Sequence, residues 1–87
     1  MKNKVSIIIP FHNVENYILE CLNSVISQTL KDIEIICIDD GSDDKSRQIV
    51  EQIKSNDERI ILLSTPKAMG QSHARNLGLE VATGEYI

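Results

Sequence analysis

Long hydrophobic runs and an excess of positive charge are both missing from this sequence of 87 residues. The longest apolar run, from Val5 to Pro10 with Ser6 interrupting it, is far too short to cross a bilayer, so we expect no membrane span. The formal net charge is −4 and the pI is close to 5.0, which argues against nucleic-acid binding because that function needs a basic face. No cleavage site follows the Met-Lys-Asn-Lys start, so we expect no signal peptide.

Cysteine is also scarce. Cys21 falls on the apolar stripe of a predicted helix, and Cys37 lies inside an isoleucine-rich strand. We predict that both are buried, reduced thiols of a cytoplasmic protein. A metal site would need closer spacing and further ligands, and neither is present.

What remains is the composition of one small folded domain. Hydrophobic residues make up 41% and charged residues 25% of the chain, which is ordinary for a globular domain and excludes extensive disorder. A chain of this length holds one sheet and a few helices, so residues 1–87 are interpreted as a single domain.

Strand-like segments recur along the chain. Apolar, largely β-branched runs at residues 5–9, 34–39 and 59–63 predict strands covered on both faces, and residues 85–87 resemble the start of a fourth. Pro66 helps to end the third strand.

Helix-like segments fill the intervals. Apolar residues at i, i+3, i+4 spacing predict a helix from Val14 to Ile26. Asn13 is its predicted N-cap, and Glu15 lies in the first turn, where the helix dipole favours an acid. A second helix carries Ile49, Val50 and Ile53 on its apolar face. A third opens at residues 70–72 and is expected to end near Gly84.

The resulting order, βαβαβαβ, predicts an α/β fold with a mostly parallel, doubly wound sheet. Ligands of such sheets bind at the carboxyl ends of the strands. Two segments, residues 10–13 and residues 40–44, must therefore lie at the ligand-binding edge.

The loops at that edge exclude three common chemistries. The first loop, Pro10-Phe11-His12-Asn13, has no glycine and cannot be the Gly-x-Gly-x-x-Gly turn of a dinucleotide-binding domain. No phosphate-binding P-loop motif occurs anywhere. A phospho-accepting receiver domain needs an acidic pair after the first strand, whereas here Asp39 and Asp40 follow the second.

Six segments together are similar to the N-terminal, nucleotide-binding part of GT-A-fold glycosyltransferases of family 2. They are residues 5–13, 27–30, 34–36, 39–44, 70–76 and 84–87. Each motif alone is weak, since Asp-Asp-Gly-Ser is also a plain turn sequence. Their common order, and their positions on the predicted strands and helices, carry the resemblance.

The resemblance implies roles for single residues. Asp40 contacts the base, and Pro10 and His12 contact the nucleoside, with His12 at a position that is often tyrosine. Asn13 and Glu15 match the family's polar residues at the start of the first helix, although N-capping and a first-turn acid also explain them.

Elementary electrostatics agrees with this placement. A carboxylate accepts hydrogen bonds from a base N–H or from ribose hydroxyls but repels a diphosphate, so Asp39 and Asp40 belong at the nucleoside end. Ser42, Asp43 or Asp44 caps the second helix, with Ser42 also retained as a binding residue. Arg75 either faces the diphosphate or pairs with a carboxylate of the acidic loop, and we favour the pairing.

The same resemblance implies what this chain lacks. In the family, an Asp-x-Asp segment that binds Mg²⁺ or Mn²⁺ follows the fourth strand, and the catalytic base lies further on. We therefore expect a fragment that binds a nucleotide sugar weakly, most often a UDP-sugar, and transfers nothing by itself.

The resemblance implies a cytoplasmic location, at the membrane face for the full-length protein. The truncated sheet edge is expected to promote self-association. A stand-alone nucleotide- or partner-binding module and a small structural domain remain the alternatives.

Overall fold

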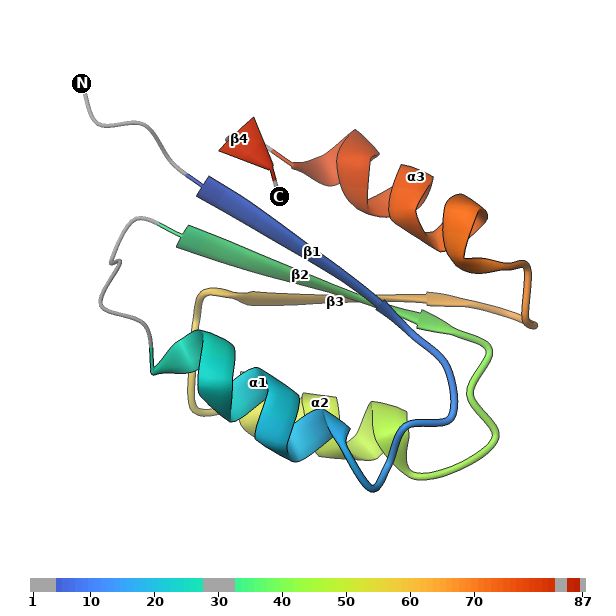
Figure 1. The fold of residues 1–87 in the computed structure, drawn as a ribbon, viewed down its shortest axis with the longest axis horizontal. Helices are drawn as coiled ribbons and strands as arrows, with labels where there is room; N and C mark the ends of the chain where they lie inside the picture. The colour runs from blue at the N-terminus through green and yellow to red at the C-terminus, as the bar shows by residue number, and fades with distance from the viewer. Residues whose placement is uncertain (1–4, 28–32, 83–84, 87) are drawn as a thin grey trace.

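The computed structural model describes residues 5–27, 33–82 and 85–86. Strands and helices alternate along the chain in the predicted order (Figure 1). They are β1 (Val5–Phe11), α1 (Ile18–Ile26), β2 (Ile33–Asp40), α2 (Ser46–Lys54), β3 (Ile60–Thr65), α3 (Gln71–Val81) and β4 (Glu85–Tyr86). Gly84, the predicted end of the third helix, lies outside the described residues, as does Ile87.

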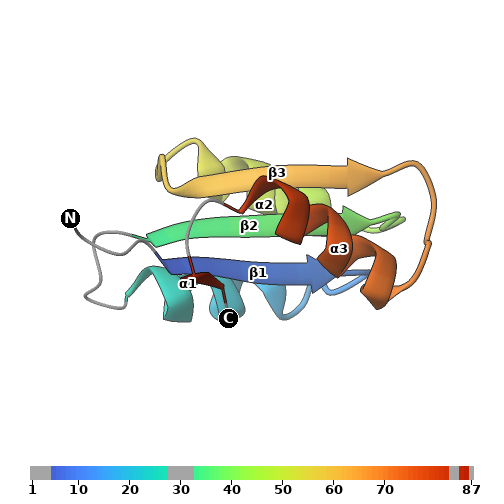
Figure 2. The same ribbon diagram turned by 90° about the horizontal axis from the view of Figure 1, so that it is seen from above.

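The four strands form one parallel sheet in the order β3-β2-β1-β4. α1 and α2 lie against one face and α3 against the other, as Figures 1 and 2 show. The predicted parallel, doubly wound α/β fold is therefore confirmed. Every strand ends at the same edge of the sheet, which brings the loops after β1, β2 and β3 together.

The centre of the fold is β2, which is buried along its whole length. Ile35 and Cys37 face the α1–α2 layer, while Ile36 and Ile38 face α3. Burying one isoleucine side chain contributes about 1.5–3 kcal/mol, so this strand accounts for much of the stability of so small a core. The continuous apolar run of β2 exists because helices cover both faces.

The first helix begins later than its sequence pattern predicts. The N–H groups of Tyr17 and Ile18 both donate to the Val14 carbonyl, at 2.9 and 2.8 Å, so residues 14–17 form a turn before α1. Asn13 has a φ of +51°, in the left-handed region. An N-cap residue normally has extended backbone angles, so the N-cap assignment of Asn13 and the first-turn assignment of Glu15 are both wrong.

The two cysteines differ. Cys37 is buried as predicted, and burial raises the pKa of its thiol to about 12. Cys21 is exposed, so the prediction for it is wrong. The reason is that α1 has only nine residues and buries Ile18 and Leu22, which leaves Cys21 at the edge of the apolar stripe.

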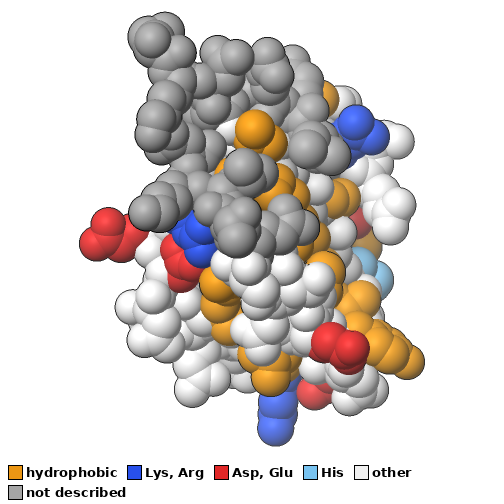
Figure 3. All heavy atoms as spheres, turned by 60° about the vertical axis from the view of Figure 1, so that its left-hand side comes forward, with side chains coloured by type: hydrophobic (Ala, Val, Ile, Leu, Met, Phe, Trp, Pro, Cys, Tyr) orange, Lys and Arg blue, Asp and Glu red, His pale blue; other side chains and the backbone are white. Residues whose placement is uncertain are grey.

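Some hydrophobic side chains reach the surface between α1 and α2. Leu19, Ile26, Ile49 and Ile53 contribute to a groove of 790 Å³. Figure 3 shows orange side chains at the surface in the lower half of the molecule, the height at which Figure 1 places these helices. The groove extends along the two helices and is separate from the site described below.

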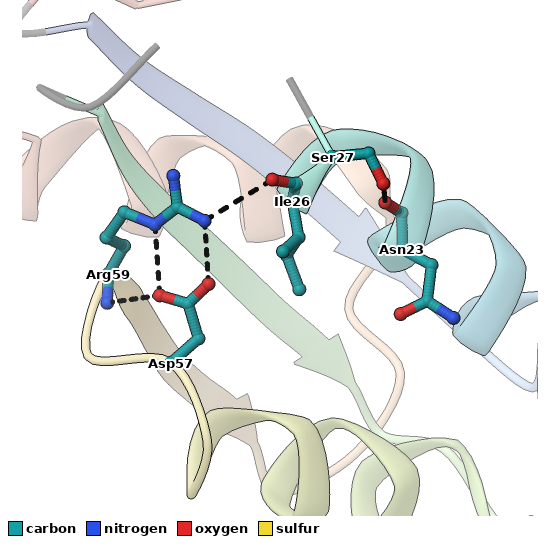
Figure 4. Close-up of polar contacts among 5 residues, drawn as sticks. All are labelled: Asn23, Ile26, Ser27, Asp57 and Arg59. Atoms are coloured by element: carbon teal, nitrogen blue, oxygen red, sulfur yellow. Dashed lines mark hydrogen bonds and ion pairs between the residues drawn. The ribbon is translucent and has the colours of Figure 1, made fainter. Parts of the chain in front are cut away.

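An ion pair in the turn before β3 lies beside the end of α1 (Figure 4). The Arg59 guanidinium donates to both carboxylate oxygens of Asp57, at 3.0 and 2.7 Å, and to the Ile26 carbonyl at 3.5 Å. Hydrogen bonds from the Arg59 side chain, the largest cause, hold the pKa of the Asp57 carboxyl below its usual value. The pair therefore fixes where α1 ends relative to the sheet.

We expect Asp57→Asn to lower the free energy of unfolding by about 1 kcal/mol at pH 6. Folding lowers the pKa of Asp57. The contribution of Asp57 to the free energy of unfolding is therefore complete above pH 3.8, the ordinary pKa, and is lost as the pH falls through the lowered pKa of the folded state. Urea denaturation of both proteins from pH 6 to pH 2 checks this. A difference that stays constant with pH would contradict it.

Candidate functional site

Asp40, the last residue of β2, organises the carboxyl edge of the sheet. Its side chain is 4% exposed. One carboxylate oxygen accepts hydrogen bonds from the Met69 N–H at 2.8 Å and the Thr65 hydroxyl at 3.2 Å, and the other accepts from the Gly70 N–H at 2.9 Å. Asp40 therefore holds the loop between β3 and α3 against the end of β2.

The same contacts keep Asp40 charged. The Met69 N–H, with the Gly70 N–H and the Thr65 hydroxyl, holds the pKa of the Asp40 carboxyl below its usual value, although burial acts in the opposite direction. An ionised carboxylate has room for about four hydrogen bonds, and three are made. Oδ1 accepts two of these bonds and Oδ2 accepts one.

Asp40 lines a cavity of 580 Å³ at the carboxyl edge. Pro10 and His12, which the sequence analysis placed with the nucleoside, line it as well. The remaining lining is largely apolar: Ile9, Phe11, Val14, Tyr17, Ile18, Cys21, Ala68, Gly70 and Gln71. An apolar cavity with one charged acceptor suits a flat ring that carries an N–H group.

Asp39 and Ser42 do not line this cavity. Asp39 is buried, and its carboxylate accepts the Ser42 N–H at 2.9 Å. The Ser42 hydroxyl in turn accepts the Asn13 N–H at 3.0 Å. Both side chains therefore shape the loops, and their predicted contacts with a nucleotide stay predictions.

Side chains after β2 hold the loop after β1 through successive backbone groups. The Val14 N–H donates to the Ser46 hydroxyl at 2.7 Å, and the Glu15 N–H donates to Asp44 Oδ2 at 3.1 Å. In return, the Asp43 N–H donates to the Asn13 side-chain oxygen at 2.8 Å. We call this set, together with the Asn13–Ser42 bond, the inter-loop network.

Asp44 has two roles in the inter-loop network. Its Oδ1 accepts the N–H of Ser46, the first residue of α2, at 2.9 Å. The N-cap residue of α2 is Lys45, and among the described residues no side chain caps this helix, so the predicted cap by Ser42, Asp43 or Asp44 is wrong. Burial alone would raise the pKa of Asp44, but hydrogen bonds from Ser46 and Glu15 outweigh it and lower that pKa. Asp44 therefore stays ionised and joins both loops.

Sequence reasoning missed Ser46 and Thr65. Thr65 could have been found, because it ends β3 at the edge where Asp40 ends β2. Nothing in the pattern distinguished Ser46 from an ordinary first-turn residue, since its partner lies 32 positions away.

Ser46→Ala is expected to lower the free energy of unfolding by about 1–2 kcal/mol. Ser46 is fully buried, so its loss leaves the Val14 N–H without its acceptor. Urea denaturation checks this against Ser27→Ala, which removes an exposed hydroxyl that bonds the Asn23 carbonyl within α1 (Figure 4). Equal effects of the two substitutions would contradict the role assigned to Ser46.

Arg75 and Glu15 lie outside the cavity. Arg75 lines a neighbouring hollow of 340 Å³ with Ile8, Pro10, Gln71 and Ser72, and within the described part of the chain it forms no ion pair. The favoured pairing of Arg75 with the acidic loop is therefore not found. Glu15 lines the groove between α1 and α2.

Residues 5–27, 33–82 and 85–86 contain no group of three or more acidic, histidine or cysteine side chains able to hold a metal ion. The carboxylates of Asp39, Asp40 and Asp44 accept backbone N–H groups, so they are turned toward the protein. Over the same residues, no helix is long and apolar enough to cross a membrane.

Comparison with known families decides the identity. The model of glycosyl transferase family 2 matches residues 6–87. The chain belongs to this family. Among curated relatives, glycosyltransferase GlyA of Streptococcus pneumoniae is 44% identical over 85 residues, which are 98% of this chain and 12% of GlyA. The curated relatives that this family 2 chain matches are longer, and it spans about an eighth to a third of their length.

Solved structures agree with the family and with the predicted GT-A-like fold. Staphylococcus aureus TarS 1–349 in complex with UDP-GlcNAc has a TM-score of 0.87 at 33% identity, with 97% of this chain and 26% of TarS covered. A mannosyltransferase of Pyrobaculum calidifontis, in complex with GDP-Man and Mn²⁺, has a TM-score of 0.88 at 25% identity, with 97% and 26% covered.

Proposed function

We propose that this family 2 chain binds the nucleoside part of a nucleotide-sugar donor, whose sugar the full-length transferase moves to an acceptor. The observation that carries the proposal is that Asp40, whose carboxyl pKa is lowered, lines one cavity together with Pro10 and His12. The proposal includes a cytoplasmic location, since unpaired Cys21 and Cys37 fit a reducing compartment.

In this proposal the 580 Å³ cavity binds the nucleoside, and the neighbouring hollow of 340 Å³ receives the diphosphate. A base N–H or a ribose hydroxyl donates to Asp40, while the apolar walls and the His12 ring contact the flat base. The negative charge of Asp40 directs the diphosphate away from it. Because Pro10 lines both hollows, the diphosphate can extend toward Arg75, whose exposed cation suits it. The UDP-GlcNAc bound by TarS supports a UDP-sugar as the donor.

A divalent metal belongs to the proposal for the full-length enzyme only. The Mn²⁺ and GDP-Man in the P. calidifontis complex support Mg²⁺ or Mn²⁺ there, where it would neutralise the diphosphate. The described residues offer no cluster of three ligands to such an ion, and the carboxylates of Asp39, Asp40 and Asp44 are already bonded to backbone N–H groups. We therefore expect binding by this chain to be independent of metal.

Nucleotide titration followed by NMR tests the proposal. UDP, GDP, UDP-GlcNAc and GDP-mannose are added to the chain with and without Mn²⁺. We expect weak, saturable binding of a uridine nucleotide that perturbs Asp40 and His12, with no sugar transfer. The absence of saturable binding by any of these nucleotides would favour a partner-binding or purely structural domain. Sugar transfer by the 87-residue chain would contradict the proposal that this chain binds the donor without transferring its sugar.

Self-association is a further part of the proposal. β4 pairs only with Val5 and Ser6 of β1, so within the described structure the rest of β1 has no strand on that side. Unpaired strand edges invite pairing with another chain. Sedimentation at rising concentration should show dimers or larger species, and a clean monomer would contradict this.

A further inference from the structure

Both ring nitrogens of His12 are bonded within the protein. Nδ1 lies 2.7 Å from the Asp40 carbonyl oxygen, and Nε2 lies 3.2 Å from the side-chain nitrogen of Asn13. A carbonyl oxygen can only accept, so Nδ1 must carry the hydrogen and donate it.

The orientation of the Asn13 amide shows the state of the other ring nitrogen, Nε2. The Asp43 N–H is 2.8 Å from one end of this amide, and because a backbone N–H can only donate, that end is Oδ1. The NH₂ group of Asn13 therefore faces His12. An NH₂ group has no acceptor, so Nε2 must offer a lone pair, which requires the neutral Nδ1–H form of the ring.

We propose that Asn13 is a positioning residue that holds His12 as the neutral Nδ1–H tautomer, so that the imidazole meets the nucleoside with its ring face. His12 lines the 580 Å³ cavity on one side and a polar hollow of 500 Å³ on the other. With both nitrogens occupied, it has only its faces and C–H edges to offer to either space. The identity of the ligand rests on the function proposed above, whereas the tautomer does not.

The backbone of Asn13 makes this arrangement possible. Its φ of +51° lies in the left-handed region, which asparagine tolerates better than most residues do. That conformation directs the side chain back across the loop, between His12 and the Asp43 N–H. Asn13 therefore contacts His12 and the Asp43 N–H, and it does not cap a helix.

Charged and titratable groups also face His12 from several elements. They are Asp40 of β2, Asp43 of the following loop, Arg47 of α2, Lys67 of the loop after β3, Tyr17 just before α1 and Cys21 within α1. Two of these groups are acids and two are bases, so neither sign of charge prevails in the two spaces. The contact between Nε2 and the Asn13 NH₂ group favours the ring form with a lone pair on Nε2.

NMR of the chain with ¹⁵N-labelled histidine tests the tautomer directly. The sequence has two histidines, and His73, exposed on α3, is the internal control. At mildly alkaline pH, His12 should show a hydrogen on Nδ1 and none on Nε2, whereas His73 should show the Nε2–H form that free imidazole side chains prefer. A His12 in the Nε2–H form would overturn the proposal.

Asn13→Asp tests the positioning role. It keeps an oxygen for the Asp43 N–H but places a carboxylate oxygen at Nε2. Nε2 must then donate to that oxygen, so ¹⁵N spectra at neutral pH should show a hydrogen on both ring nitrogens of His12, while the His73 signals are unchanged. UDP binding at neutral pH should weaken about tenfold, because a charged ring must be desolvated to stack. Asn23→Asp, which adds the same charge on α1, should change neither quantity.

A His12 whose Nε2 stays without a hydrogen, or unchanged UDP binding, in Asn13→Asp would overturn the positioning role. If the variant fails to fold, the wild-type tautomer still decides the assignment. Should that tautomer be found in a chain that binds no nucleotide, the proposed function fails and the tautomer assignment stands.

Discussion

Replacing Gly41 with alanine is expected to lower the free energy of unfolding by about 3 kcal/mol or more. Gly41 has a φ of +68°, and a Cβ atom there would lie 2.3 Å from the Ala68 nitrogen and 2.4 Å from the Lys67 carbonyl carbon. Both are backbone atoms, so no side-chain rotation relieves the contact. The loop after β3 would have to move away from the end of β2, which would also break the Asp40 hydrogen bonds.

Gly70→Ala is the matched control. Its φ of +98° is just as unsuited to alanine, but a Cβ there would meet nothing within 4 Å. The substitution therefore measures backbone strain without the steric clash, and we expect it to cost less than Gly41→Ala. Urea denaturation of the two variants beside the wild-type chain gives the difference. Equal losses in the free energy of unfolding would contradict the role given to the close approach of the two loops at Gly41.

The second large effect concerns the ligand. Asp40→Asn should weaken UDP binding about ten- to a hundredfold, because the amide keeps only one accepting oxygen for the donors that the carboxylate satisfied. Its NH₂ group would also face either a backbone N–H or the ligand's own donor. Calorimetric or NMR titration with UDP measures the loss.

Glu58→Gln controls for the change of charge, since this exposed residue lies on the turn between α2 and β3, away from the cavity. It should bind UDP like the wild-type chain. Equal weakening by both substitutions would mean that net charge, and not the acceptor on Asp40, controls binding.

The pH dependence of binding follows from the same carboxylate. Hydrogen bonds from Met69, Gly70 and Thr65 lower the pKa of Asp40 below 3.8, so the charged acceptor is present at every pH above that value. UDP affinity should therefore not decline through loss of the Asp40 charge until the pH falls below 3.8 and through the lowered folded value. A loss of affinity centred between pH 5 and 6 would implicate another group.

The local sequence pattern was sufficient to predict the fold. The apolar run around Ile36 predicted a strand covered on both faces, and helical spacing between such runs predicted parallel crossovers. These signals are readable because each depends on neighbours within a few positions, where periods of 2 and 3.6 residues separate strands from helices. The position of Asp40 at the ligand-binding edge followed from the same logic, since all parallel strands end at one edge.

Contacts between segments distant in the sequence decided where the first helix begins. Residues 14–17 follow a helical pattern, yet the helix begins only at Ile18. The reason is that backbone groups of the first loop bond to Ser42, Asp44 and Ser46, about thirty positions away.

The sequence by itself therefore determined the α/β fold, the family resemblance and the place of Asp40. Only the tertiary structure decided that Asp39, Ser42 and Ser46 shape the loops and that Asn13 faces His12. The physical reason is that a side chain's hydrogen-bond partner depends on which loops the folded sheet brings together, and spacing along the chain does not encode that.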